Sequence, residues 1–247
     1  MGQRLKLVVA YDGAPFGGWQ SQTHGNTVQD LLERAFRRVD GTRVRVHAAG
    51  RTDAGVHALA QCAHADVTND RLPPVRWIAA LNANLPPQVR VLRCRRVAKD
   101  FHARYSAVGK VYRYRIWSGP VLPPLEHDRV WHLPAELNLL AMRRAAASFI
   151  GRHDFAGFVA NRGQPDSNTV RTIHSVTVRR HGFAWTLEFA GDGFFYKMVR
   201  LMVGAIVECA MGKIEPAEVL ARLRRRERRG RRLAAPAAGL YLIRVRY

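Results

Sequence analysis

Hydrophobic and polar residues alternate in four segments of the first hundred residues, a pattern typical of half-buried β-strands. These segments are residues 5–11, 43–49, 57–67 and 88–97. After the capping-box sequence that begins at Thr27, apolar residues recur at helical spacing up to position 39. A second helix is predicted to begin at Pro74 and to end before residues 84–87. The predicted order is strand, helix, strand, strand, helix, strand, which is the ferredoxin-like arrangement.

The second half of the chain predicts a similar order. Strands are expected at residues 110–117, 170–180, 183–190 and 240–247, and helices at 136–150, 195–210 and 218–226. The two middle strands form a predicted hairpin across His181 and Gly182, and residues 117–126 and 160–168 are expected to be loops. We therefore predict an α+β fold of two tandem ferredoxin-like subdomains, residues 1–107 and 108–247, with a cleft between them.

The charge of the chain is unusual for a globular protein. Forty Lys and Arg residues against nineteen Asp and Glu give a formal net charge of +21 and a pI near 11.3. Such a surface attracts a polyanion, and the spread of basic residues along the whole chain favours nucleic acid over a membrane. Codon bias toward Arg and Ala is the competing explanation. The densest run, residues 222–232 with eight arginines, is either a solvated helix end or a phosphate contact.

Several other classes of protein are disfavoured by the sequence. No apolar run approaches the roughly 18 residues that a membrane span needs. The N-terminus passes directly into a predicted strand without a signal-peptide pattern. Cys62, Cys94 and Cys209 lie far apart and form no Cys-x-x-Cys pair, which argues against a zinc site or a disulfide framework. We expect a cytoplasmic protein.

The first candidate for chemistry is the segment GRTDAGVH at residues 50–57, between two predicted strands. Gly50 and Gly55 permit backbone geometry that other residues avoid, so a tight turn can project Asp53 outward. Arg51, two residues away, can hold the Asp53 carboxylate in its ionised form. The alternative is that Asp-Ala-Gly is only a turn between two strands.

Two further features lie in the second half. Arg200 falls within an apolar helical stretch, where an unpaired guanidinium is costly to bury, so it must reach solvent or meet a carboxylate. Tyr112 and Tyr114 share one face of a predicted strand, and Arg113 and Arg115 share the other. Such a strand can stack a base and bind phosphate, or it can simply contribute to core and surface.

A series of short sequence runs carries a resemblance to a known family. In order they are residues 11–13 with 18–20, 27–29, 50–57, 82–86, 101–107, 112–114, 198–200 and 239–242. One such run would be weak evidence, but eight in sequence order are specific. The chain resembles the tRNA pseudouridine synthase A family along almost its entire length.

This resemblance implies a continuous, mostly antiparallel sheet shared by the two halves, with the active site in the cleft. It also implies a homodimer that acts on the anticodon stem–loop of tRNA without a cofactor or a metal. The catalytic aspartate of the family falls on Asp53, its active-site tyrosine on Tyr112, and the arginine that pairs with the aspartate on Arg200. The residues that flank Arg200, among them Lys197 and Leu201, depart from the family pattern.

The expected reaction detaches uracil N1 from the ribose, turns the base and rejoins it through C5. The target uridine has to leave its stack, and Tyr112 is expected to stack on the flipped base. Asp53 either attacks ribose C1′ or base C6, or removes a ribose proton toward a glycal. A non-catalytic RNA-binding protein is the main rival, although the aromatic strand signature of that module is absent. An RNA methyltransferase is disfavoured because no Gly-x-Gly loop follows the first strand.

Overall fold

The computed structural model describes residues 2–160, 168–225 and 232–247. Most of the predicted loop 160–168 and most of the arginine-rich run 222–232 therefore lie outside the described residues. The chain divides into two compact units: the first contains residues 1–108 and 241–247, and the second contains residues 109–240. The proposed subdomain border after residue 107 stays a prediction, and residues 241–247 of the last strand group with the first unit.

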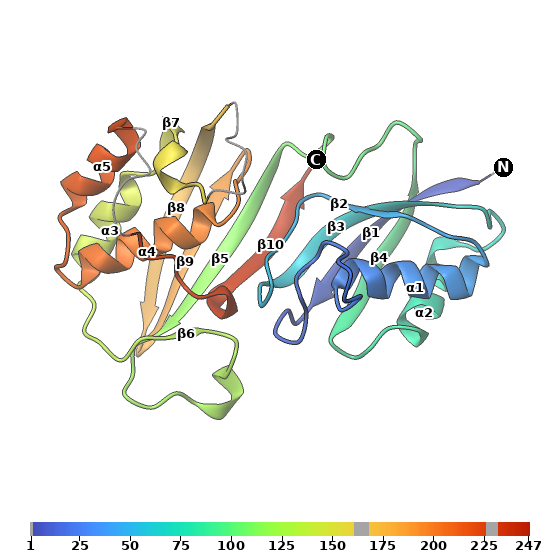
Figure 1. The fold of residues 1–247 in the computed structure, drawn as a ribbon, viewed down its shortest axis with the longest axis horizontal. Helices are drawn as coiled ribbons and strands as arrows, with labels where there is room; N and C mark the ends of the chain where they lie inside the picture. The colour runs from blue at the N-terminus through green and yellow to red at the C-terminus, as the bar shows by residue number, and fades with distance from the viewer. Residues whose placement is uncertain (1, 161–167, 226–231) are drawn as a thin grey trace. The chain divides into compact units, whose positions relative to one another are not determined.

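The first unit has the predicted order of strands and helices (Figure 1). Its elements are β1 (Gln3–Tyr11), α1 (Val28–Asp40), β2 (Val46–Ala48), β3 (His57–Val67), α2 (Pro74–Ala83), β4 (Val89–Val97) and the C-terminal β10 (Leu240–Arg246). Strand β1 lies antiparallel between β4 and β3, and β3 also pairs antiparallel with β2. This is the strand order of a ferredoxin-like sheet. The start of β3 pairs in parallel with β10, through His57 opposite Tyr241.

Local sequence explains where the helix α1 begins and ends. The Thr27 side chain accepts a hydrogen bond from the backbone N–H of Asp30, and Gly41 ends the helix with a φ of 79°. The helix buries Leu32 and Phe36, and the Phe36 ring lies 5.5 Å from the Trp77 ring of α2. Strand β2 is shorter than the predicted 43–49 because only residues 46–48 pair with β3.

The second unit is also built on antiparallel strands. Its elements are β5 (Gly109–Trp117), β6 (Trp131–His132), α3 (Leu139–Ala147), β7 (Gly151–Asp154), β8 (Val170–His181), β9 (Ala184–Gly191), α4 (Met198–Ala210) and α5 (Pro216–Arg225). The order across the sheet is β5-β9-β8-β7. The hairpin across His181 and Gly182 is confirmed, with a φ of 58° at Gly182. Strands β6 and β7, with two and four residues, are too short to show an alternating pattern.

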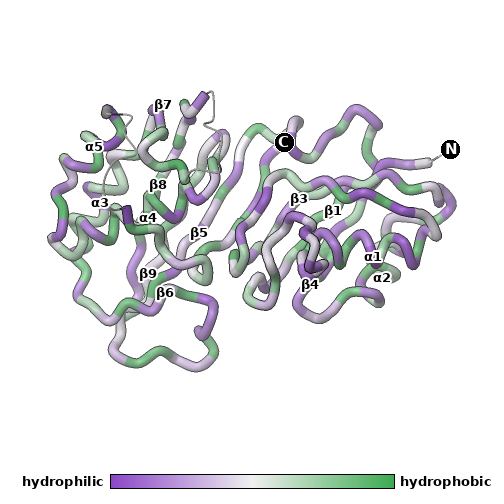
Figure 2. The backbone as a smooth tube through the Cα atoms, in the orientation of Figure 1, coloured by the Kyte–Doolittle hydropathy of each residue, from purple (hydrophilic) through white to green (hydrophobic). Residues whose placement is uncertain are grey.

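The helices of the second unit cover one face of its sheet (Figure 1). On that face Tyr114 of β5 stands opposite Leu187 of β9, and both side chains are fully buried. Helix α4 buries nearly all of its residues, so it is apolar on every side instead of amphipathic (Figure 2). It begins three residues later than predicted, because Lys197 before it has a left-handed φ of 57°.

The predicted α+β class is confirmed, since helices and antiparallel strands alternate through both units. The cleft between the two halves stays a prediction. Among the described residues, the helices are too short or too polar to cross a membrane.

Candidate functional site

The turn that carries Asp53 connects β2 to β3, and hydrogen bonds to three of its backbone carbonyl groups hold it in place. The Gly50 carbonyl accepts a hydrogen bond from Gln61 Nε2 at 2.8 Å. The Thr52 carbonyl accepts one from the Trp19 N–H at 3.0 Å, and the Asp53 carbonyl accepts one from the Val56 N–H at 3.1 Å. The Asp53 side chain is half-buried. The backbone before Asp53 is therefore tied to neighbouring elements, and the hydrogen bond from Val56 closes the turn after it.

The predicted role of glycine in this turn is confirmed at one of two positions. Gly55 has a φ of 77°, which a residue with a Cβ atom rarely adopts. Gly50 does not have a positive φ. The sharp change of direction therefore follows Asp53 rather than preceding it, and it leads directly into β3.

The end of β1 and the segment between β1 and α1 support the Asp53 turn from the side. The hydroxyl groups of Tyr11 and Thr52 lie 2.8 Å apart, and both side chains are buried. Gly18, with a φ of 93°, passes so close that a methyl group there would lie 2.7 Å from the Thr52 carbonyl oxygen. Sequence reasoning did not select these residues, although Tyr11 and Gly18 both stand in the runs that match the family.

His57 fixes the start of β3, next to the turn. Its ring is almost fully buried and stacks on the Tyr241 ring with a centroid distance of 4.6 Å. Its Nδ1 accepts a hydrogen bond from the Gly13 N–H at 3.1 Å. A methyl group at Gly13 would lie 2.1 Å from the Val56 carbonyl oxygen, so only glycine fits there. The Asp53 turn, residues 11–13 and β10 thus pack against one another within the first unit.

Tyr112 lies on β5 of the second unit, where its side chain is 8% exposed. Its ring meets the Phe194 ring edge to face, with a centroid distance of 5.1 Å. Tyr114, two residues on, donates a hydrogen bond from its hydroxyl to the Pro236 carbonyl at 2.7 Å. The prediction that both tyrosines share one face of a strand is confirmed by their register against β9.

Arg200 lies in the first turn of α4 and is half-buried. Its Nε donates a hydrogen bond to the Ala235 carbonyl at 2.7 Å, and its own carbonyl accepts one from the Ala235 N–H at 3.0 Å. Burial raises the pKa of the nearby Tyr114 well above its usual value, and the positive charge of Arg200 acts in the opposite direction. The segment around Ala235, which the helical pattern does not reveal, therefore positions this guanidinium.

The four predicted site residues are divided between the two units. Asp53 and the exposed Arg51 belong to the first unit, and Tyr112 and Arg200 belong to the second. The pairing of Asp53 with Arg200, which bridges the units, stays a prediction.

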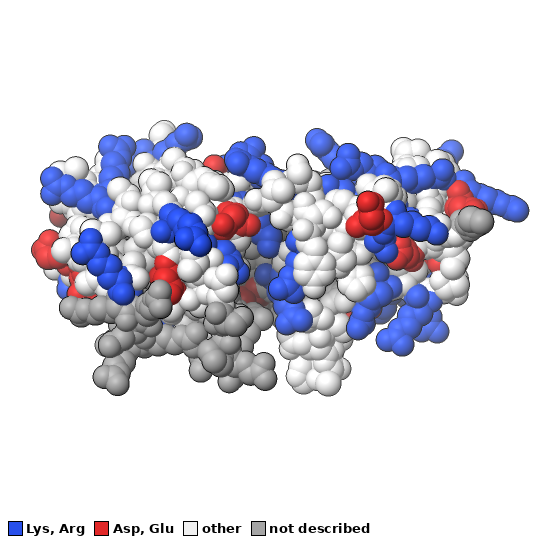
Figure 3. Space-filling model, turned by 90° about the horizontal axis from the view of Figure 1, so that it is seen from above, with Lys and Arg blue, Asp and Glu red and all other residues white. Residues whose placement is uncertain are grey.

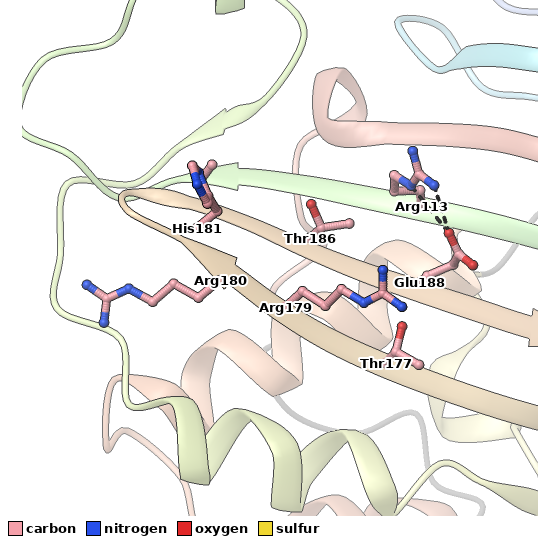
Figure 4. Close-up of a pocket in the computed structure, with 8 residues that line it drawn as sticks. Arg113, Thr177, Arg179, Arg180, His181, Thr186 and Glu188 are labelled. Atoms are coloured by element: carbon pink, nitrogen blue, oxygen red, sulfur yellow. Dashed lines mark hydrogen bonds and ion pairs between the residues drawn. The ribbon is translucent and has the colours of Figure 1, made fainter.

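A separate shallow pocket of about 430 Å³ lies on the other face of the second unit's sheet (Figure 4). Arg113 of β5 forms an ion pair with Glu188 of β9 there at 3.0 Å, and Arg179 of β8 lies beside it. Because neighbouring strand residues point to opposite faces, the Arg113 side chain points away from the face that carries Tyr112. The pocket is therefore not part of the predicted catalytic site.

Basic side chains are prominent on the surface, as the net charge of +21 requires (Figure 3). Within the described ranges, no group of three or more His, Cys, Asp or Glu residues is arranged to hold a metal ion. Three histidine rings, those of His47, His64 and His102, lie together with centroids 4.6 to 5.9 Å apart, and of these pairs only His47 and His64 are stacked.

Comparisons with known proteins agree on one family. The family model described as tRNA pseudouridine synthase matches residues 7–106 and 145–247. A protein of Akkermansia muciniphila named tRNA pseudouridine synthase A is 46% identical over 99% of this chain and 95% of its own length. The protein of the same name from Acetivibrio thermocellus is 42% identical over 99% of this chain and 100% of its own length. The chain therefore belongs to the tRNA pseudouridine synthase A family.

Proposed function

We propose that this protein isomerises uridine to pseudouridine in tRNA, with Asp53 as the catalytic carboxylate. The observation that carries the proposal is the hydrogen-bonded turn that holds Asp53. It stands in a chain that two proteins named tRNA pseudouridine synthase A match over 99% of its length. The net charge of +21 suits a polyanionic substrate.

The reaction begins with an ionised Asp53. Breaking the bond between uracil N1 and ribose C1′ frees the base, which turns and rejoins C1′ through C5. The C5 proton is then lost and N1 takes up a proton, so that the product is an isomer of the substrate. Asp53 acts by covalent attack at C1′, by attack at C6, or by removing a ribose proton toward a glycal. Each route needs the carboxylate to be held in one orientation. The hydrogen-bonded backbone carbonyls of Gly50, Thr52 and Asp53 restrain the turn that carries it.

The remaining site residues have supporting roles in this proposal. Tyr112 stacks on the flipped uracil, and its contact with Phe194 holds the ring in place. Arg51 and Arg200 are the proposed cationic partners of the Asp53 carboxylate. The Ala235 carbonyl holds the Arg200 side chain through Nε.

The partner is the anticodon stem–loop of tRNA, and the protein acts as a homodimer in the cytoplasm without a cofactor or a metal. Exposed apolar side chains of the second unit, Val121, Leu125 and Phe183, offer surface that a second copy can cover. Light scattering coupled to gel filtration tests the dimer, and a monomeric mass at micromolar concentration would contradict it.

Tritium release from tRNA that contains 5-tritiated uridine tests the reaction directly. We expect the Asp53→Asn variant to release no tritium and still to bind tRNA. Asp100→Asn, which changes an exposed aspartate outside the site, serves as the matched control and should retain full activity. Full turnover by Asp53→Asn would overturn the catalytic assignment. A wild-type protein that binds tRNA without releasing tritium would instead indicate a non-catalytic RNA-binding protein.

A further inference from the structure

The Asp53 turn has a buried support that the catalytic assignment leaves unexplained. Thr52 directly precedes Asp53 and is 6% exposed, and its side chain and its carbonyl each have a partner, one at the end of β1 and one in the segment between β1 and α1. The hydroxyl of Thr52 lies 2.8 Å from the hydroxyl of Tyr11, and its carbonyl accepts a hydrogen bond from Trp19. Thr52 is thus held at two points, its side-chain hydroxyl and its backbone carbonyl.

We propose that Tyr11, through its hydrogen bond to Thr52, is a positioning residue that sets the orientation of the Asp53 carboxylate. The inference rests on the proposed function, because it assigns a role toward the same carboxylate.

Tyr11 is itself held firmly. Its side chain is 4% exposed at the end of β1, and its ring lies 6.0 Å from the Trp19 ring. Burial raises the pKa of Tyr11 to about 12, against the opposing effect of hydrogen bonds from Thr52 and Gln61. The phenol therefore stays neutral throughout the physiological pH range, so its hydrogen bond to Thr52 does not vary with pH.

The Trp19 contact connects the turn to a helix terminus. The carbonyls of Gly18 and Trp19 accept hydrogen bonds from the N–H groups of Val28 and Gln29, at 3.1 and 3.0 Å. These donors belong to the first turn of α1, which has no partners for them within the helix. Helix α1 thus holds Trp19, Trp19 holds the Thr52 carbonyl, and Tyr11 holds the Thr52 side chain.

Two supports on Thr52 leave its backbone little freedom. Rotation about the bonds on either side of Thr52 would move Asp53, since the two residues are adjacent. The Gly18 backbone closes the remaining space, because even a methyl group there would meet the Thr52 carbonyl. A catalytic group has to stay within about 0.5 Å and 10–20° of its productive geometry. The Tyr11–Thr52 hydrogen bond supplies part of that restraint.

The first test is the Tyr11→Phe variant, which removes one hydroxyl and keeps the ring. We expect kcat for tritium release to fall about ten- to a hundred-fold, the range that a small misplacement of a catalytic group produces, with KM for tRNA nearly unchanged. A merely structural role would lower the melting temperature and the folded fraction without changing kcat per folded molecule. Unchanged kcat would therefore overturn the proposal.

Substitutions at Thr52 test whether Tyr11 acts through this residue. Thr52→Val removes the hydroxyl at nearly constant volume and should lower kcat as Tyr11→Phe does. Thr52→Ser retains the hydroxyl and should restore most of the activity. The double variant Tyr11→Phe with Thr52→Val should be no slower than the slower single variant, because the two changes break one interaction. If the fold-losses in kcat of the two single variants instead multiply in the double variant, the two residues act independently, and the proposal is contradicted.

Tyr247→Phe is the matched control. Its hydroxyl donates a hydrogen bond to the Ala103 carbonyl at 2.7 Å, so the variant also loses one tyrosine hydrogen bond in the first unit. Its kcat should equal that of the wild type. A wild-type protein that releases no tritium would refute the proposed function itself, and an active Asp53→Asn variant would refute the catalytic assignment on which the positioning role depends. An inactive Asp53→Asn variant together with a fully active Tyr11→Phe variant would refute only the positioning role.

Discussion

The sheets of both units present basic residues on the face opposite their buried core, but in the first unit one of these residues, Lys6, is covered by aromatic rings. In the first unit, Lys6 is 8% exposed, and its ammonium group lies 3.4 Å from the ring centroid of Tyr247 and 4.6 Å from that of Phe101. In the second unit, Arg113 and Arg179 line an open pocket (Figure 4). Alternation along a strand therefore identifies a polar face without telling whether that face meets water.

The cover on the first unit comes from segments that are distant in sequence. Tyr247 is the last residue, and its hydroxyl reaches the Ala103 carbonyl in the segment that follows β4. The Ala103 N–H donates in turn to Nδ1 of the buried His64 on β3, at 3.1 Å. Aromatic rings replace water around the Lys6 charge, because their faces attract cations. These ring contacts allow the lysine to be buried.

The largest expected effect that separates the two faces is on stability. Lys6→Ala removes both ring contacts and the buried aliphatic part of the side chain. We therefore expect the free energy of unfolding, measured by urea denaturation, to fall by about 2 kcal/mol. Arg179→Ala removes an exposed side chain from the open face and should change stability by less than about 0.5 kcal/mol. Equal losses in the two variants would show that the faces do not differ as described.

A smaller effect is expected from the C-terminal residue of the cover. Tyr247→Phe loses the hydrogen bond to Ala103 but keeps the ring above Lys6. The free energy of unfolding should fall by about 1 kcal/mol, the usual net contribution of one hydrogen bond. A loss as large as that of Lys6→Ala would indicate that the hydroxyl, rather than the ring, holds the cover in place.

The pH dependence of stability provides a further test of the packing around His64 in the first unit. Burial, aided by His102 and His47, lowers the pKa of His64 from 6.5 to about 4. Between these values the unfolded chain binds a proton that the folded protein does not, so stability should fall as the pH drops from 6.5 toward 4. His64→Asn, which can still accept the Ala103 N–H, should lose less stability over this window. Parallel urea-unfolding profiles for the two proteins would contradict this assignment.

Much of the fold could be predicted from the sequence because its signals are local. The capping box at Thr27, the helical spacing after it and the alternation in β1 and β3 each reflect neighbouring residues. The hairpin at Gly182 carried its own turn signal. The extent of β2 was predicted less well, because only residues 46–48 pair with β3, and alternation along the sequence does not reveal where that pairing stops. Strands β6 and β7 were missed, since their pairing depends on residues far away in sequence.

The candidate site shows the same division. Asp53 and the positive φ at Gly55 were predictable, because a short segment with glycine at the turn carries that signal. Tyr11 looked like an ordinary strand residue, and its partner Thr52 lies 41 positions away. The Ala235 carbonyl that holds Arg200 stands in a segment without periodicity.

The α+β class, the order of the main helices and strands, the basic charge and the family resemblance with Asp53 as its candidate carboxylate all follow from the amino-acid sequence. The contacts of Thr52 with Tyr11 and Trp19, and the burial of Lys6 beside the exposure of Arg179, follow from the folded structure alone. The physical reason is that propensity and periodicity act between near neighbours. Hydrogen bonds, ring contacts and close packing at glycine join residues that only the folded chain brings together.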